Sequence, residues 1–337
     1  MTMTKITNLE QISNGMNDYQ DISHKIKNEL ELAQNVLIIS HQKPDGDTLG
    51  ANLALTTYLT NQNKNVTSFC LDKITDTFYF LPNSHLSTNN HLVFTKQYDV
   101  VIVVDSGSLP YAGVDKLLTA LPTGYTLINL DHHLSNNNYG DINLVITSAA
   151  STTEIIYRLF NAWEINWTPD IATNLICGII TDTSGFTNPA TNYRTLEAGA
   201  FLINQGANVN QVAKLTLFNQ DINQLKLWGR ALSRLTKIKK YDLVYTYLTQ
   251  EDFVECEADE SASEGITNFL HILKEATIIM MIRETNNGFI KGSLRTSSDD
   301  VDLTKLAALM GGGGHKKASG FALPGKLSCD NNKLRAI

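Results

Sequence analysis

The chain has 337 residues, of which 42% are hydrophobic and 18% charged, a composition typical of globular proteins with about two domains. Acidic side chains outnumber basic ones by 34 to 27, which gives a net charge of −7. Coating a long nucleic acid requires many Lys and Arg side chains, so this balance excludes a broad phosphate-binding face but not a small nucleotide site. The four cysteines are scattered without a Cys-x-x-Cys pair, which argues against a disulfide framework and a thiolate zinc site.

The N-terminal residues Met1 to Asn14 are polar and lack the apolar segment of a signal peptide. No run of the sequence approaches the 18 apolar residues of a membrane-spanning helix. We therefore expect a cytoplasmic protein without a membrane partner.

The first two hundred residues alternate short apolar runs with helical patterns. The expected strands are Val36–Ser40, Val66–Cys70, Val100–Val104, Thr126–Leu130 and Ile142–Ile146, and the expected helices include Leu49–Thr60, Val114–Ala120 and Thr152–Ala162. Val/Ile runs without polar alternation are typical of strands buried on both faces. The pattern predicts a doubly wound α/β domain with a mainly parallel sheet.

The second half of the chain changes pattern after Pro169. Helices are expected at Ile171–Ile180, Arg194–Asn204, Val209–Leu217 and Ile222–Lys237, followed by strands at Asp242–Leu248, Ala276–Glu284 and Gly288–Arg295. The segment Asn286-Asn287-Gly288 has the composition of a hairpin turn. We expect a catalytic domain over residues 1–205, a helical linker over 206–236 and a smaller α/β domain over 237–337.

Aspartates and histidines follow the predicted strands of the first domain. The first strand is followed by His41, Asp45 and Asp47, the strand Val100–Val104 by Asp105, and the strand Thr126–Leu130 by Asp131, His132 and His133. The apolar stretch of a predicted helix is followed by Asp182. In a parallel sheet the carboxyl ends of the strands face one crevice. Taken singly, a residue such as Asp47 is a helix cap, but the set taken together predicts a functional site.

Such a crowd of carboxylates requires compensation, because buried like charges repel and raise one another's pKa. Divalent metal ions supply the positive charge that compensates these carboxylates. A mixed His/Asp set without Cys suits Mn²⁺, with Mg²⁺ or Co²⁺ as alternatives. The number of ligands is too large for one ion with open positions, so we expect two ions that share an Asp, the arrangement of two-metal phosphoryl chemistry.

Near the C-terminus, four glycines, Gly311 to Gly314, precede His315. Such a loop either exposes amides that cradle an anion or is a flexible tip, and its composition leaves both alternatives open. Arg295 ends an apolar strand, where it is a surface charge or a phosphate-binding guanidinium.

Together these motifs resemble those of the DHH phosphoesterases and their associated C-terminal domain, and the resemblance covers nearly the whole chain. The matching segments are His41-x-x-x-Asp45-Gly46-Asp47, Asp105, Asp131-His132-His133, Asp182 within GIITDTSGF, Ser293-Leu294-Arg295-Thr296 and Gly311 to Gly320. The chain is similar to the compact two-domain nanoRNase type of this family. Two departures concern substrate contacts: no Arg follows Asp105, and Thr187 stands where a basic residue can occur.

The resemblance implies a role for each site residue. One metal is held by His41, Asp45 and Asp105, and the second by Asp47, Asp105, His132 and Asp182, with Asp105 bridging. His133 contacts the scissile phosphate or the leaving oxygen, and Asp131 orients a neighbouring imidazole. Arg295, Thr296, Gly313, Gly314 and His315 bind substrate, which places the active site in the interdomain cleft.

The resemblance also implies an activity: hydrolysis of very short oligoribonucleotides to mononucleotides, and of 3′-phosphoadenosine 5′-phosphate (pAp) to AMP. The expected partners are short RNA or DNA oligonucleotides and nucleotides, with no long nucleic acid, and a homodimer is compatible. The alternatives are a soluble phosphodiesterase acting on cyclic di-AMP or pApA, a RecJ-type single-strand exonuclease, and a non-catalytic nucleotide-binding protein. The acidic net charge disfavours the exonuclease, and the complete ligand set disfavours the binding protein.

Overall fold

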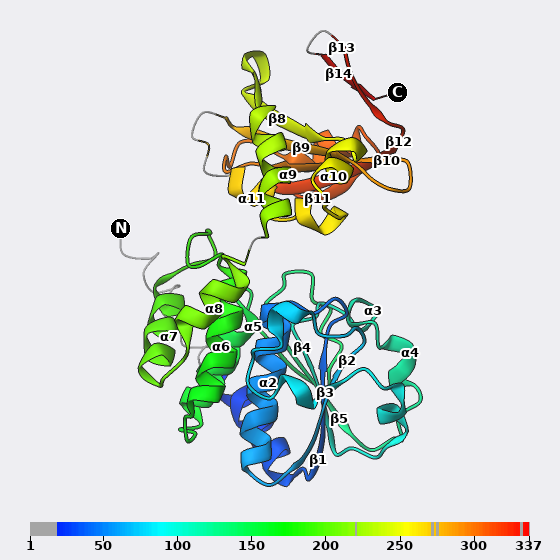
Figure 1. Ribbon diagram of the computed structural model, residues 1–337. Helices are drawn as coiled ribbons and strands as arrows, with labels where there is room; N and C mark the ends of the chain where they lie inside the picture. The colour runs from blue at the N-terminus through cyan, green and yellow to red at the C-terminus, as the bar shows by residue number, and fades with distance from the viewer. Residues whose placement is uncertain (1–18, 220, 271–272, 274–275, 331–332, 337) are drawn as a thin grey trace, which may run out of the picture. The chain divides into compact units, whose positions relative to one another are not determined.

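The computed structural model describes residues 19–336 except 220, 271–272, 274–275 and 331–332 (Figure 1). The chain forms two compact units, Met1–Asn219 and Gln220–Ile337. Within the described ranges, none of the helices is long and apolar enough to cross a lipid bilayer.

The first unit is built on a six-stranded parallel sheet with the order β3-β2-β1-β4-β5-β6. The strands are β1 (Asn35–Ser40), β2 (Asn65–Cys70), β3 (Ser87–Thr88), β4 (Val100–Val104), β5 (Thr126–Asp131) and β6 (Ile142–Val145). The strand order reverses between β1 and β4, and open parallel sheets bind ligands at the carboxyl end of such a switch point.

Helices cover both faces of this sheet, with α2, α5 and α6 on one side and α3 and α4 on the other (Figure 1). Alternate residues of β1 explain this arrangement, because Val36 and Ile38 belong to one buried apolar cluster while Leu37 and Ile39 belong to a second. The doubly wound α/β fold expected from the sequence is confirmed. The first helix of the unit ends at residue 32. The α-helices that follow are α2 (Gly46–Asn61), α3 (Leu109–Ala112), α4 (Asp115–Leu118), α5 (Thr152–Ala162), α6 (Pro169–Asp182), α7 (Tyr193–Asn204) and α8 (Val209–Thr216).

Helices α2 and α6 pack closely against each other. The Asp45 carboxylate caps α2 by accepting hydrogen bonds from the amides of Asp47 and Thr48. A side chain at Gly50 would collide with the backbone carbonyl of Asn174, so the contact requires a glycine. The N-terminus of α2 and the C-terminus of α6 each carry acidic residues of the predicted site.

The second unit contains a six-stranded sheet with the order β11-β12-β10-β9-β8-β7, and a separate hairpin of β13 and β14. Its strands are β7 (Thr236–Ile238), β8 (Leu243–Leu248), β9 (Ile278–Glu284), β10 (Phe289–Arg295), β11 (Gly313–His315), β12 (Ala318–Pro324), β13 (Leu327–Asp330) and β14 (Lys333–Ala336), and its helices are α9 (Ile222–Ser233), α10 (Gln250–Glu255), α11 (Ile266–Phe269) and α12 (Leu303–Ala308). The expected helix Ile222–Lys237 is too long, because α9 ends at Ser233 and both Thr236 and Lys237 pair with β8 instead.

Candidate metal centre

Neighbouring strands of the parallel sheet bring the predicted acidic and imidazole groups of the first unit together. His41 follows β1, Asp105 follows β4, and Asp131 is the last residue of β5. Asp105 adopts a left-handed backbone with φ of 57°, a conformation that costs about 1–3 kcal/mol for a residue with a side chain. Such strain is concentrated at functional sites.

One group of potential ligands consists of His41, Asp45 and Asp105, whose ligand atoms lie within 4.8 Å of one another. His41 Nε2 lies 3.7 Å from Asp45 Oδ1 and 3.4 Å from Asp105 Oδ2. The other ring nitrogen, Nδ1, lies 2.7 Å from the carbonyl oxygen of Gln42. Because a carbonyl only accepts, Nδ1 donates its proton there, and Nε2 is the nitrogen that faces the carboxylates.

A second group consists of Asp47, His132 and Asp182, again within 4.8 Å. His132 Nδ1 lies 3.4 Å from the carbonyl oxygen of Ala149, so its Nε2 also faces the cluster, 3.3 Å from Asp182 Oδ2. Asp105 lies between the two groups. Its Oδ2 faces His41, and its Oδ1 is 3.6 Å from His132 Nε2.

His133 differs from the other two histidines in its surroundings. Its Nδ1 lies 2.7 Å from Oδ1 of the fully buried Asp131, whose Oδ2 accepts a hydrogen bond from Asn136 Nδ2. The bond to Asp131 raises the pKa of His133 and outweighs the opposing effect of burial. The His133 side chain is 42% exposed, against 5% for His41 and 17% for His132. It is therefore the histidine that a ligand in solvent reaches first.

The electrostatics of the cluster favour a bound cation. Burial, with repulsion from neighbouring carboxylates, raises the pKa of Asp47 and Asp182 well above the usual range. Burial lowers the pKa of His41, but its bonds to Asp105 and Asp45 outweigh this and raise it to about 11. Among the described residues, the carboxylates of Asp45, Asp105, Asp131 and Asp182 form their ion pairs with histidines. Oxygen and imidazole ligands around uncompensated negative charge fit divalent metal ions.

The structure places four of the predicted substrate-binding residues, Arg295, Gly313, Gly314 and His315, on the sheet of the second unit, and the fifth, Thr296, directly after β10. Arg295 of β10 and His315 of β11 both pair with Ala318 of β12, which puts them in one row across the three strands. Gly313 and Gly314 form part of β11, so they are not purely loop residues as the sequence suggested. Thr296 is buried, and its hydroxyl donates to the carbonyl oxygen of Thr277.

The first turn of α5 contacts the predicted site, although its sequence alone does not indicate a role there. Thr152 and Thr153 donate hydrogen bonds to Asp47, and the Thr152 hydroxyl also donates to Asp105. A run of Ser and Thr before an apolar stretch is a recognisable helix-start signal. It does not say which side chains from other elements the turn contacts.

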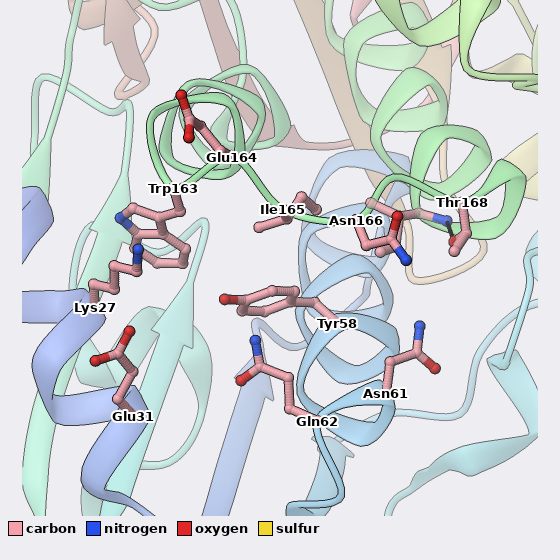
Figure 2. A pocket seen from close by; sticks show the side chains of 11 residues that line it. Lys27, Glu31, Tyr58, Asn61, Gln62, Trp163, Glu164, Ile165, Asn166 and Thr168 are labelled. Carbon is pink, nitrogen blue, oxygen red and sulfur yellow. Dashed lines mark hydrogen bonds between the residues drawn. The ribbon is translucent and has the colours of Figure 1, made fainter.

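A cavity of about 550 Å³ in the same unit lies between residues of α2 and the segment that follows α5 (Figure 2). Tyr58 projects from α2 toward Trp163, and the amides of Gln62 and Asn166 lie around it. Its lining contains none of the candidate metal ligands. The candidate chemistry of this unit therefore lies at the strand ends and not in this cavity.

Comparison with known proteins agrees with the ordered motifs. The DHH family N-terminal domain matches residues 35–179, and the DHHA1 domain matches residues 229–336. The chain contains a DHH domain followed by a DHHA1 domain. The first match contains the strand ends with His41, Asp105 and Asp131, and the second contains the row with Arg295 and His315.

Curated relatives of this DHH protein cover most of its length. It is 25% identical to the bifunctional oligoribonuclease and PAP phosphatase NrnA of Thermus thermophilus, over 86% of this chain and 84% of the relative. It is 24% identical to the protein of the same name from Bacillus subtilis, over 87% of this chain and 91% of the relative. An exopolyphosphatase-related protein from Bacteroides fragilis has a similar structure, with a TM-score of 0.82 and 26% identity over 91% and 92% of the two chains.

Proposed function

We propose that this protein is a metal-dependent phosphoesterase that hydrolyses very short oligoribonucleotides to mononucleotides, and pAp to AMP. The observation that carries the proposal is the position of Asp105 between two groups of ligands, with one carboxylate oxygen facing each group. The names of the curated relatives support the choice of substrates.

The two groups of ligands would hold two divalent metal ions, with Mn²⁺ the metal that suits the ligand types best. The first ion would be held by His41 and Asp45, and the second by Asp47, His132 and Asp182. Asp105 would contribute to both sites. When bound, such ions lower the pKa of water and neutralise charge on the phosphoryl oxygens. The protein's contribution is to hold each imidazole in the tautomer that directs Nε2 inward, through the carbonyl oxygens of Gln42 and Ala149.

His133 would act on the substrate. Its Nδ1 is fixed by Asp131, which leaves Nε2 to donate a hydrogen bond to a phosphate oxygen or a proton to the leaving oxygen. The raised pKa keeps the proton on the ring to a higher pH than usual. A general acid needs this property at neutral pH.

The second unit would bind the remainder of the substrate through Arg295 and His315. A guanidinium binds a phosphate in a bidentate manner, and one such group suffices for about one phosphate. With a net charge of −7, the chain offers little general attraction to a longer strand. We therefore expect ligands of a few nucleotides to be preferred over long ones.

The decisive experiment compares substrates side by side in the presence of Mn²⁺. Dinucleotide RNA, pAp, a long single-stranded RNA and cyclic di-AMP are incubated with the wild-type protein and with Asp105→Ala as the matched inactive control. We expect turnover of the dinucleotide and of pAp, little turnover of the long RNA, and none with the variant. Faster turnover of cyclic di-AMP than of both favoured substrates, or equal turnover by Asp105→Ala, would refute the proposal.

A further inference from the structure

The first turn of α5 packs directly against the candidate metal centre. The N-cap residue Ser151 and the helical residues Thr152, Thr153 and Glu154 are all fully buried. None of them belongs to the predicted ligand set. Their contacts nevertheless determine how two of the ligand carboxylates are held.

Asp47 receives three hydrogen bonds from this turn. The amide of Thr152 donates to Oδ2 at 2.6 Å. The amide of Thr153 donates to Oδ1 at 2.9 Å, and the Thr153 hydroxyl donates to the same oxygen at 2.7 Å. A carboxylate oxygen has two acceptor positions, so Oδ1 is fully used, while Oδ2 keeps one position free.

The direction of these bonds is fixed by their neighbours. The Thr153 hydroxyl has one proton, which it gives to the Asp47 carboxylate, so it must accept from the Ser151 hydroxyl 2.8 Å away. Ser151 in turn accepts from the amide of Glu154 at 3.1 Å. The result is a continuous chain of donors that starts at a helical amide and ends on Asp47 Oδ1.

The same turn also hydrogen-bonds Asp105, and the Glu154 side chain fixes the turn to neighbouring elements. The Thr152 hydroxyl donates to Asp105 Oδ1 at 3.0 Å, so one residue links Asp47 with the carboxylate that lies between the two ligand groups. The buried carboxylate of Glu154 accepts from the amide of Ala150 and from the hydroxyl of Thr195, and forms an ion pair with Arg158. The turn is therefore tied to α7 as well as to the metal ligands.

We infer that Thr152 and Thr153 are positioning residues for the metal centre, and that they leave Asp47 Oδ2 as the oxygen that binds the cation. The inference rests on the metal centre of the proposed function and adds to it the residues that orient the ligands. Groups of this kind, which hydrogen-bond a ligand without touching the ion, typically change metal affinity by about 10–100-fold. The effect is confined to the ion that Asp47 holds when only Thr153 is changed.

The test is a calorimetric titration with Mn²⁺ alone, without substrate. Thr153→Ala removes the hydroxyl and Thr153→Ser retains it, so their difference isolates the contribution of this hydroxyl, which links Ser151 to Asp47. Thr57→Ala is the matched control, because this buried threonine lies on α2 with Asp47 but donates to the carbonyl oxygen of Leu53. We expect Thr153→Ala to weaken one of two Mn²⁺ sites by about 10–100-fold, Thr153→Ser to bind nearly as the wild type does, and Thr57→Ala to bind unchanged.

Wild-type affinity at both sites in a folded Thr153→Ala variant overturns the inference. Should that variant fail to fold, Ser151→Ala leaves the Thr153 hydroxyl in place and removes its donor, together with the cap that accepts from the Glu154 amide. We expect a smaller loss at the same site, and no loss there overturns the inference equally. A wild-type protein that takes up no Mn²⁺ contradicts the proposed metal centre itself. The two failures are therefore distinguishable.

Discussion

Gly178 allows α6 to pass directly beside Asp47, and replacing it by alanine tests how tightly the centre is packed. A methyl group at this position would lie 2.5 Å from Thr153 Cγ2 and closer still to Asp47 Oδ1. Since carbon atoms pack at about 3.5–4.0 Å, the neighbours have to move by about 1 Å. A displacement of that size at a catalytic site costs about 10²-fold in rate.

The same substitution has a smaller effect on stability. Alanine in a helix is favoured over glycine by about 1 kcal/mol, whereas overpacking of a core costs about 1–3 kcal/mol. The expected net loss of unfolding free energy for Gly178→Ala is therefore only about 0–2 kcal/mol. Activity should fall far more than stability does.

The assay combines dinucleotide turnover, a Mn²⁺ titration and thermal unfolding of the same preparations. Gly229→Ala is the matched control, because Gly229 lies in α9 and an added methyl group would meet nothing within 4 Å. We expect this control to retain full turnover and to gain up to about 1 kcal/mol in stability. Wild-type Mn²⁺ affinity and turnover in Gly178→Ala would show that Asp47 and Thr153 need not be held as tightly as the structure indicates.

Three further predictions concern the ligands. Asp105→Ala should lose both metal ions and His41→Ala only one, because Asp105 faces both groups; metal analysis that finds two ions in Asp105→Ala contradicts this. His132→Ala should lose metal, while the more exposed His133→Ala should keep both ions and turn over slowly, and equal metal loss in the two variants argues against separate roles. Mn²⁺ affinity should rise with pH, because the raised pKa of the buried carboxylates and of His41 means that metal binding displaces protons. Calorimetry in buffers of different ionisation enthalpy measures this proton release, and its absence refutes the prediction.

The sequence by itself was sufficient to predict the α/β fold of the first unit and the edge of its sheet at which the acidic groups lie. Apolar runs such as Val36–Ser40 and Val100–Val104 are buried on both faces, so their composition alone predicts a parallel sheet between helices. Residues that follow such strands share one edge, because all the strands run in the same direction. This is why His41 and Asp105, 64 positions apart in the sequence, were expected to meet.

Tertiary structure alone decided how the groups face one another. The contacts of Thr152 and Thr153 with Asp47 span 105 and 106 residues, and they depend on the packing of α5 against α2, which no local pattern encodes. The end of α9 at Ser233 has the same origin, because Thr236 and Lys237, which the sequence pattern placed in a helix, gain strand partners in β8. Helix and strand propensities amount to less than about 1 kcal/mol per residue, so long-range pairing and packing determine the outcome wherever they disagree.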